Sequence, residues 1–434
     1  MSILDGYEKV ILPDIPNLNQ IAVYEQHGGY EGFKKSIKMT PDEVINEVKA
    51  SGLKGRGGAG FPTGLKWSFM PKGDKIRYLA CNGDEGEPGT FKDRQIFESN
   101  PHLFIEGCLI ACYAMQITSA YVYIRGEYLK WINILQASLD EAYAKGYVGK
   151  NILGTGFSTE IIIHRGAGAY ICGEESSLMN SLEGKRPYPR IKPPFPAQVG
   201  LWGQPTTINN IETIANTAVV MRKGAAWYAS IGAPKHPGPV LYGISGHVNK
   251  PGIYEGPTGL PLKDLIYDVA GGIKNGKKLK AVIPGGSSTP ILTPELVEKA
   301  VMDADGLRAV GTSLGTAGII VMDEDTDLVE TLYTLSKFYH HESCGQCTPC
   351  REGTGWLEKV VAKFVNHEAN QQDYDLLLKI CAQMEGRTVC ALADAAAWPV
   401  RNTITRFKEE FEARMIDDKN KIGWDYSMKA VSGV

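Results

Sequence analysis

The sequence has almost no excess charge, because 46 Lys and Arg residues stand against 49 Asp and Glu residues in a chain of 434. A formal charge of −3 creates no overall field that would attract nucleic acid or an anionic membrane surface, so we expect neither as a partner. The cysteines number nine, and an odd set cannot pair completely within one chain as a disulfide scaffold requires. These scarcities exclude a basic nucleic-acid-binding protein and a disulfide-stapled secreted domain.

Long hydrophobic runs are also missing, with one stretch that needs attention. Residues 107–124 carry no charge over a length close to that of a short membrane span, but Gln116, Thr118 and Ser119 interrupt the stretch. A helix over 101–115 followed by a strand over 120–124 explains it better. The N-terminus also lacks the basic and apolar regions of a signal peptide. We therefore expect no direct membrane insertion and an intracellular location, where thiols stay reduced.

Glycine is present in excess, with 49 residues where about 30 would be usual. Two glycine-rich loops lie among strands expected over 77–81, 120–124 and 160–164, which alternate with helices. This alternation is typical of an α/β layer with a mostly parallel sheet. We predict a Rossmann-like α/β domain over residues 41–237, preceded by an N-terminal extension over residues 1–40.

The order of expected strands and helices changes near residue 238. Strand, strand, helix, strand, strand is the order expected for a small β-grasp unit, over 240–245, 252–255, 262–270, 281–284 and 318–322. After residue 327 the pattern is helical. We therefore predict a β-grasp domain over 238–327 and an all-α helical bundle over 328–434.

A run of closely spaced thiols carries the strongest chemical signal in the sequence. Cys344, Cys347 and Cys350 follow one another at two-residue gaps and can converge on one centre. Structural zinc usually takes CxxC pairs, whereas three such thiols with a distant fourth favour a [4Fe–4S] cluster. Cys390 and Cys381 are the downstream candidates for the fourth ligand; Cys381 lies in a helical run typical of a packed thiol.

The two glycine loops offer close backbone approach to a ligand. The first, residues 55–64, follows an expected helix instead of a strand, so it is not the usual dinucleotide fingerprint. The second, residues 166–175, leads into a helix that begins with two glutamates, which suit the helix dipole but repel a phosphate. A phosphate fits better where small polar donors open a helix at 206–213, although a plain N-cap explains that segment equally well. A proline-rich connection over 186–205 is expected to form an ordered loop over the site.

Five motifs in fixed order resemble one family over nearly the whole chain, from about residue 28 to 415. They are RGGAGFPTGLKW (56–67), DEGEPG (84–89), GAGAYICGEE (166–175), PGGSS (284–288) and ESCGQCTPCREG (342–353). Together they are similar to the NADH-binding flavoprotein subunit of respiratory complex I. No motif covers the first 27 residues.

The resemblance implies FMN, NADH and a [4Fe–4S] cluster as cofactors of an NADH dehydrogenase, in which flavin accepts a hydride and releases single electrons. The loop expected to bind NADH is Gly55, Arg56, Gly57, Gly58, Ala59, Gly60, Phe61, Pro62, Thr63 and Gly64. The residues expected around FMN are Lys66, Asn82, Asp84, Tyr170, Gly173, Glu174, Asn209, Asn210 and Thr213. The expected catalytic carboxylates facing the nicotinamide are Glu87 and Glu175, and the expected stacking rings are Phe61, Phe69 and Phe195. The expected cluster ligands are Cys344, Cys347, Cys350 and Cys390.

By the same resemblance, the partners would be a thioredoxin-like [2Fe–2S] subunit and a large multi-cluster iron–sulfur subunit. Localisation would be cytoplasmic, peripheral to the inner membrane through those partners. Two alternatives are a diaphorase subunit of a soluble NAD-reducing hydrogenase, formate dehydrogenase or electron-bifurcating complex, and a zinc-stapled interaction module. Many such diaphorase subunits carry extra cysteine-bearing extensions that this chain lacks, which favours complex I.

Overall fold

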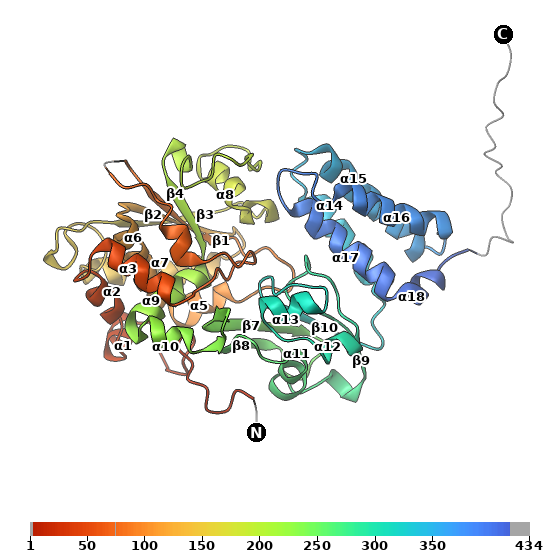
Figure 1. Ribbon diagram of the computed structural model, residues 1–434, viewed down its shortest axis with the longest axis horizontal. Coiled ribbons are helices and arrows are strands. Elements are labelled where there is room, and N and C mark those ends of the chain that lie inside the picture. The colour runs from red at the N-terminus through yellow and green to blue at the C-terminus, as the bar shows by residue number, and fades with distance from the viewer. Residues whose placement is uncertain (1–2, 74, 417–434) are drawn as a thin grey trace, which may run out of the picture.

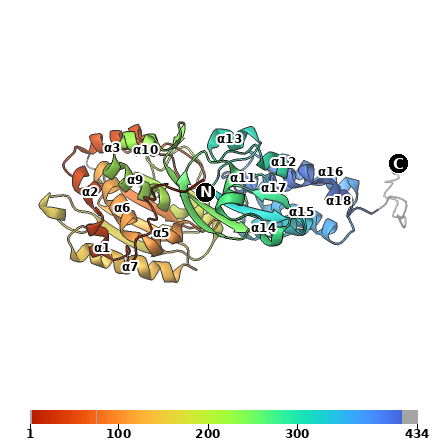
Figure 2. The same ribbon diagram turned by 90° about the horizontal axis from the view of Figure 1, so that it is seen from below.

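The computed structural model describes residues 3–73 and 75–416, and it divides into three parts that follow one another along the chain (Figure 1). An α/β part comes first, a smaller part built on a second sheet comes next, and a helical part ends the described chain. The α/β part occupies one end of the longest axis, and the second and helical parts lie side by side towards the other end (Figure 1 and Figure 2). The predictions for residues 1–2 and 417–434, which belong to the expected extension and bundle, fall outside the described residues.

The first sheet is parallel throughout, as predicted, and has the strand order β3-β2-β1-β4. Its strands are β1 Tyr78–Gly83, β2 Ser119–Ile124, β3 Glu160–Arg165 and β4 Thr206–Asn210. Successive side chains of a strand point to opposite faces, so β1 places Leu79 and Cys81 in the main core and Ala80 in a smaller core on the other side. Both faces of the sheet are therefore covered.

Helices surround this sheet in the positions that the local sequence dictates. They are α1 Ile21–Gln26, α2 Glu31–Ser36, α3 Pro41–Ala50, α4 Thr63–Trp67, α5 Asp93–Ser99, α6 Pro101–Met115, α7 Leu129–Ala144, α8 Glu175–Leu182, α9 Ile211–Lys223 and α10 Ala225–Ala229. Helix α3 starts with a capping box between Thr40 and Glu43. The uncharged stretch is the buried helix α6 followed by β2, as expected. No helix among the described residues is long and apolar enough to cross a membrane.

Residues 1–40, expected as an extension, are built into the α/β part where they are described. Ile11, Tyr24 and Phe33 are buried in the main core. The Glu255 carboxylate accepts the backbone N–H groups of residues 10–12 at 2.7–3.1 Å. The segment therefore joins the α/β part to the second sheet.

The second sheet has the strand order β8-β7-β10-β9. Its strands are β7 Pro239–Gly246, β8 Gly252–Pro257, β9 Leu279–Ile283 and β10 Gly318–Asp323; β5 Gly232–Ala233 and β6 His236–Pro237 form a small separate ribbon. Strands β7 and β8 form the expected hairpin, and β10 runs parallel to β7 and antiparallel to β9. The predicted helix over 262–270 is a short α11, Leu262–Asp264, continued by a π-helical turn over Leu265–Val269. Helices α12 Pro294–Val297 and α13 Ala304–Ala309 complete this part.

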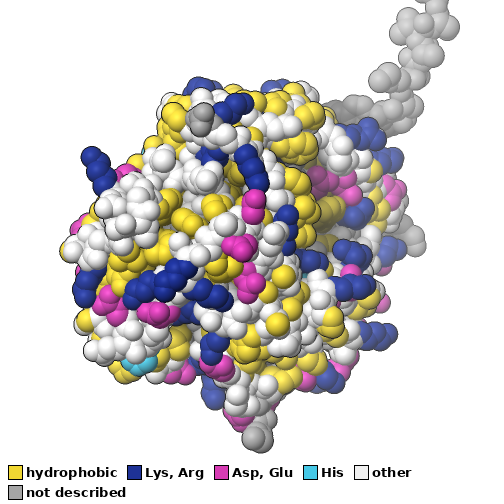
Figure 3. Space-filling view, turned by 60° about the vertical axis from the view of Figure 1, so that its left-hand side comes forward, with side chains coloured by type: hydrophobic (Ala, Val, Ile, Leu, Met, Phe, Trp, Pro, Cys, Tyr) yellow, Lys and Arg dark blue, Asp and Glu magenta, His cyan; other side chains and the backbone are white. Residues whose placement is uncertain are grey.

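The last part consists of helices, as the sequence predicts, and their core also takes in Ile171 of the second glycine loop. They are α14 Leu328–Glu342, α15 Thr348–Val365, α16 Gln371–Met384, α17 Leu392–Arg406 and α18 Lys408–Glu412. Cys344 and Cys347 lie between α14 and α15, and Cys390 lies between α16 and α17. On the face of the molecule shown in Figure 3, basic and acidic side chains are intermixed, in keeping with the small net charge.

Candidate functional site

A cavity of about 340 Å³ lies where the three parts of the chain meet. The α/β part contributes both glycine loops and the acidic loop after β1, and the second part contributes Gly285, Ser288 and Thr316. The helical part contributes Cys390 and the start of α17. Its size fits the range of small-molecule sites, and its walls come from elements that no single part could supply. We call it the main cavity.

The acidic loop after β1 supplies a buried carboxyl to this cavity. Asn82 donates its side-chain amide to the Gly173 carbonyl at 2.8 Å and accepts the Asp84 N–H at 3.0 Å, which fastens the two loops together. Burial raises the pKa of Asp84 to about 8. The buried Asp84 Oδ2 has no hydrogen-bonding partner among the residues that the structure describes. A neutral carboxyl with a free oxygen suits the polar edge of a flavin ring, so the residues fit FMN.

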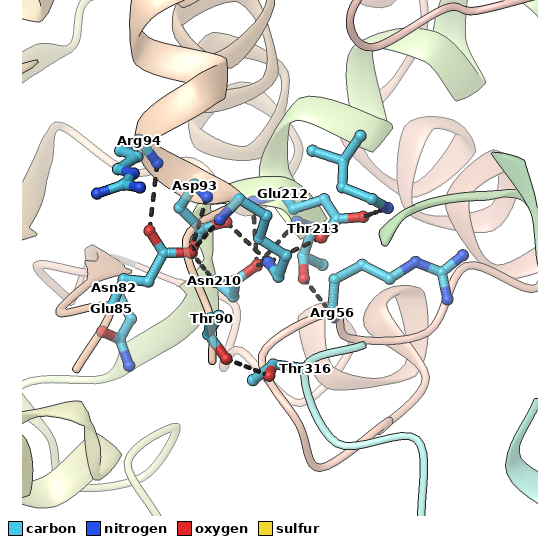
Figure 4. Close-up of polar contacts among 12 residues, drawn as sticks. Arg56, Asn82, Glu85, Thr90, Asp93, Arg94, Asn210, Glu212, Thr213 and Thr316 are labelled. Atoms are coloured by element: carbon cyan, nitrogen blue, oxygen red, sulfur yellow. Dashed lines mark hydrogen bonds and ion pairs between the residues drawn. The ribbon is translucent and has the colours of Figure 1, made fainter. Parts of the chain in front are cut away.

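At another edge of the main cavity, a buried lysine pairs with two carboxylates. These carboxylates, Asp93 and Glu212, belong to the polar network drawn in Figure 4. Lys92 Nζ lies 2.8 Å from Asp93 and 2.7 Å from Glu212, and all three side chains are buried. Burial opposes the charge of Lys92, but the carboxylates of Asp93 and Glu212 raise its pKa, so the cation persists. Asp93, Glu212 and the Asn210 amide oxygen accept from this ammonium group, so the cation holds the cavity wall together. The sequence analysis missed Lys92; its only signal was a lysine beside the acidic loop.

The first glycine loop lies against the start of α9. The Gly55 N–H donates to the Phe61 carbonyl at 2.9 Å. The Arg56 N–H donates to Thr213 Oγ1 at 2.8 Å (Figure 4). A side chain at position 57 would meet Asn210 Cβ at 2.9 Å, so only glycine allows this approach. The loop follows helix α3, as the sequence predicted, and Gly57 and Gly58 line the main cavity.

The segment over 206–213, expected as either a phosphate site or a plain N-cap, has the geometry of strand β4 followed by a cap. Asn210 Oδ1 accepts the N–H groups of Glu212 and Thr213 at 3.0 and 3.4 Å. The Asn209 side chain accepts the Trp67 indole N–H at 3.0 Å and does not line the main cavity. The side chains of Asn210 and Asn209 are therefore used inside the fold, although Asn210 also lines the cavity.

A group of four alternating charges lies beside the second glycine loop. Glu175 pairs with Lys66 at 3.1 Å and with Lys192 at 2.6 Å, and Lys192 also reaches Glu174 at 3.1 Å. Burial would raise the pKa of Glu175, but the two lysines lower it, so this carboxylate stays ionised. The Glu174 carboxylate accepts the N–H groups of Ser176 and Ser177 and so caps α8. Lys192 comes from the proline-rich connection, so this connection reaches the charge group beside the main cavity.

The three predicted stacking rings are exposed, whereas most phenylalanines of the chain are not. Phe61, Phe69 and Phe195 are 45, 54 and 55% exposed. The rings of Phe61 and Phe69 lie 6.2 Å apart between centroids. These rings stand outside the main cavity, where exposed aromatic faces are available to a planar ligand.

Glu87 joins the α/β part to the second part at the main cavity. Its carboxylate accepts the Tyr170 hydroxyl at 2.5 Å and the Ser288 N–H at 2.7 Å. Next to it, the hydroxyls of Ser287 and Tyr339 lie 2.7 Å apart, which connects the second part to helix α14. The two predicted catalytic carboxylates thus differ in position: Glu87 lines the main cavity, whereas Glu175 belongs to the charge group beside it.

The cysteines divide into two kinds. Cys344, Cys347, Cys350 and Cys390 gather around one place: the Val389 N–H lies 3.5 Å from Cys347 Sγ, and burial followed by the charges of Glu174, Cys350 and Cys344 raises the pKa of Cys390 to about 12. Cys381 is fully buried on α16 and its thiol contacts the Ala397 carbonyl. In the described part of the chain no three His, Cys, Asp or Glu residues are grouped closely enough to hold a single ion. A cubane cluster takes one thiolate at each iron, which spaces its ligands more widely than those of one ion.

Comparison with known proteins agrees with these features. The family models described as "Nuo51 FMN-binding domain", "SLBB domain" and "NADH-ubiquinone oxidoreductase-F iron-sulfur binding region" match residues 48–219, 241–321 and 330–414. The chain is 54% identical over 390 residues to the F subunit of the NADH-quinone oxidoreductase of Rickettsia bellii, covering 89% of this chain and 94% of that protein. The chain belongs to the family of NADH-quinone oxidoreductase F subunits. It is therefore an NADH dehydrogenase flavoprotein whose cofactors are FMN, a [4Fe–4S] cluster and NADH.

One further sequence relative and one solved structure also resemble this chain. An F subunit of NADH-quinone oxidoreductase from Rhizobium meliloti is 53% identical over 391 residues, covering 89% of this chain and 90% of that one. A crystal structure of an NAD⁺-reducing [NiFe]-hydrogenase in the air-oxidized state matches with a TM-score of 0.81 and 35% identity. The match covers 89% of this chain but only 65% of the hydrogenase chain, so about a third of that chain has no counterpart here. The mixed α/β architecture with a helical C-terminal region is shared with it.

Proposed function

We propose that this chain is the electron-entry subunit of an NADH-quinone oxidoreductase, and that electrons leave the flavin past Cys390. The observation that carries the proposal is the wall of the main cavity, which holds Cys390 together with Asn82, Asp84 and Gly173. A cluster ligand and the flavin pocket therefore share one surface. Short separation favours electron transfer without any further carrier between the two cofactors.

The bound flavin supplies the chemistry, because it takes a hydride from NADH and passes electrons on singly. The chain's own residues bind and orient the flavin and the NADH. Asp84, kept neutral by burial, offers a hydrogen bond to the ring edge, and Lys92, paired with Asp93 and Glu212, fixes the wall of the cavity. Glu87 keeps the second part of the chain against Tyr170, which closes the cavity on that side. None of these steps needs a strong acid or base.

For NADH, we propose the loop Gly55–Gly64 and the exposed rings of Phe61, Phe69 and Phe195 as the docking surface. Lys66 and Lys192 flank Glu175 next to that surface. An ionised Glu175 held by two lysines can orient the nicotinamide side of the ligand by hydrogen bonding. The remaining predicted flavin contacts are Tyr170, Gly173, Glu174, Asn209, Asn210 and Thr213, of which Asn209 and Thr213 act through the position of neighbouring residues.

For the cluster, we propose Cys344, Cys347, Cys350 and Cys390 as the ligands. The packing of Cys381 against α17 supports this choice, since its thiol is turned into the helical core. We also propose domain boundaries at residues 238 and 328, with the described residues before 41 included in the α/β domain because they share its core. The strand order of the second sheet supports a β-grasp fold for residues 238–327, and the core formed mainly by α14–α18 supports a helical bundle from residue 328.

The proposed partners are a thioredoxin-like [2Fe–2S] subunit and a large multi-cluster iron–sulfur subunit. Relatives named as F subunits of NADH-quinone oxidoreductase support a place within such a complex. Association with the inner membrane from the cytoplasmic side would then come through these partners. The alternative, a diaphorase subunit of an NAD-reducing hydrogenase, is supported by the structural likeness to that enzyme. Co-purification of the neighbouring subunits separates the two.

The decisive experiment compares two cysteine variants of the purified protein. Cys390→Ser should abolish the electron paramagnetic resonance signal of the reduced [4Fe–4S] cluster, whereas Cys381→Ser should keep it. Flavin absorbance measures FMN in the same samples, and metal analysis separates iron from zinc. Loss of the cluster in Cys381→Ser but not in Cys390→Ser would contradict the proposed ligand set. A protein that contains zinc and no flavin would contradict the proposed function.

A further inference from the structure

The loop that carries three of the proposed cluster thiols starts at the C-terminal end of helix α14. Ser343 is the C-cap residue of this helix, and its N–H donates to the Tyr339 carbonyl at 3.1 Å. The preceding residue, Glu342, accepts the Tyr170 N–H of the second glycine loop at 3.0 Å. The backbone at Ser343 is therefore held by the bundle and by the α/β part just before the first thiol, Cys344.

The side chain of Ser343 contacts one of the proposed cluster thiols. Its Oγ lies 3.3 Å from Cys350 Sγ, and the same oxygen accepts the Gly345 N–H at 3.4 Å. A cysteine bound to iron is a thiolate and has no proton to give, so the serine hydroxyl is the donor of this bond. The Gly345 N–H occupies a lone pair of the oxygen, which leaves the hydroxyl proton for the sulfur.

This contact differs from the other hydrogen bonds near the proposed ligands. Cys347 Sγ is approached by a backbone group, the Val389 N–H, at 3.5 Å. The neighbouring hydroxyl, that of Thr388, donates to the Cys390 carbonyl at 2.9 Å and not to a sulfur. In the part of the chain that the structure describes, Ser343 is thus the side chain whose hydroxyl reaches a sulfur of the proposed ligand set.

The position of this bond gives it electrostatic weight. Cys350 is 7% exposed, and a hydrogen bond to a buried acceptor acts in surroundings of low dielectric constant, where its effect is larger than in water. Hydrogen bonds to the cysteine sulfurs are one of the means by which a protein sets the reduction potential of an iron–sulfur cluster. Reduction adds negative charge that the sulfurs share, so a donor stabilises the reduced form more than the oxidised form. The Ser343 hydroxyl therefore favours reduction.

We propose that Ser343 raises the reduction potential of the [4Fe–4S] cluster through a hydrogen bond to the Cys350 thiolate. Ser343 is a positioning residue, because it acts through the cysteine and makes the cluster a better acceptor for the electrons that leave the flavin. The inference rests on the proposed ligand set. It goes beyond that set, since four thiolates can hold a cluster without any side-chain donor.

The test is a redox titration of the purified protein, with FMN and the cluster bound, followed by the electron paramagnetic resonance signal of the reduced cluster. Ser343→Ala should shift the midpoint potential of the cluster to a more negative value. The expected change is about tenfold in the equilibrium constant for reduction, which corresponds to about 59 mV for one electron. Ser343→Thr keeps a hydroxyl and should keep the potential of the unaltered protein. The flavin potential, measured by absorbance in the same titration, should stay unchanged in both variants.

Thr388→Val is the matched control, since it removes a hydroxyl that donates to the carbonyl of a proposed cluster ligand instead of to a sulfur. Its midpoint potential should equal that of the unaltered protein. An unchanged potential in Ser343→Ala, or equal shifts in Ser343→Ala and Thr388→Val, would overturn the proposal. Loss of iron and of the cluster signal from Ser343→Ala would also overturn it, because the hydroxyl would then be needed to hold the cluster and not to set its potential. Absence of the cluster from the unaltered protein would instead contradict the proposed function, so the two failures are distinguishable.

Discussion

At the scale of single residues, Asp84 makes stability depend on pH. Its pKa is about 8 in the fold against 3.8 for the free side chain, because burial disfavours its charge. Between pH 4 and 8 the folded state therefore holds a proton that the unfolded state has lost, and stability falls as pH rises through that window. The slope from this one group is at most about 1.4 kcal/mol per pH unit.

Asp84→Asn should flatten this dependence, because asparagine has no proton to lose. We expect the flavin-free variant to gain stability over the unaltered protein as pH rises from 5 to 8, measured by denaturant titration at several pH values. The comparison isolates Asp84, since the other carboxyls are unchanged. Identical pH slopes in the two proteins would show that this carboxyl is ionised in the fold.

Lys66 is the second residue whose environment yields a prediction. It is one of two cations that keep Glu175 ionised, and Lys192 is the other. Lys66→Ala should weaken flavin retention or raise the KM for NADH up to about tenfold, equivalent to about 1.4 kcal/mol of binding. Ferricyanide reductase assays at varied NADH concentration measure the KM, and flavin absorbance of the purified variant measures flavin retention. Lys72→Ala is the control, because Lys72 is exposed and pairs with Asp42 away from the site; equal effects would contradict the assignment.

Residue types predicted some site members and not others. The thiols Cys344, Cys347 and Cys350 were recognisable because their spacing is itself the chemical signal. Lys92 was not, since a lysine beside acidic residues usually lies on a solvated surface, and only its burial against Glu212 and Asp93 reveals its role. Burial of a charge depends on contacts between residues far apart in sequence, which periodicity does not report.

At the scale of elements, local signals predicted most helices and strands. The capping box of α3 and the boundary between α6 and β2 are encoded within a few residues. Strand β4 was missed because its polar sequence, TTINN, has neither the alternation nor the apolar run of a buried strand; it forms because β1 supplies a parallel partner. Tertiary pairing overrode the local pattern there.

The segment over residues 10–12 has no secondary structure of its own, and one carboxylate holds it. Glu255 is 2% exposed and accepts three successive N–H groups. Glu255→Gln replaces one accepting oxygen with a donor, which should cost about 1–3 kcal/mol. Hydrogen exchange should become faster at residues 10–12. The control, Glu8→Gln, loses only a surface pair with Lys223, and equal exchange in both variants would contradict this role.

At the scale of the whole molecule, the main cavity exists only because three parts are held together. Composition and periodicity predicted the parts, but the contacts between them join residues far apart in sequence. Glu212 of α9 shows this, since it accepts the Leu241 N–H of β7 at 2.9 Å while pairing with Lys92. The glycine-rich, acidic and cysteine motifs were each visible separately. The resemblance placed the flavin site and the cluster in different domains, and only the geometry brings the glycine-rich and acidic loops together with Cys390 at one cavity.

The contact between Ser287 and Tyr339 tests how strongly the second part and the bundle are coupled. Both side chains are buried and their hydroxyls lie 2.7 Å apart. Ser287→Ala and Tyr339→Phe should each lower the unfolding free energy by about 1 kcal/mol, because each leaves a buried hydroxyl or its site unpaired. In the double variant the second substitution should cost much less, since the bond is already lost. Denaturant titration of the four proteins measures this cycle, and strictly additive losses would mean that the bond does not couple the two parts.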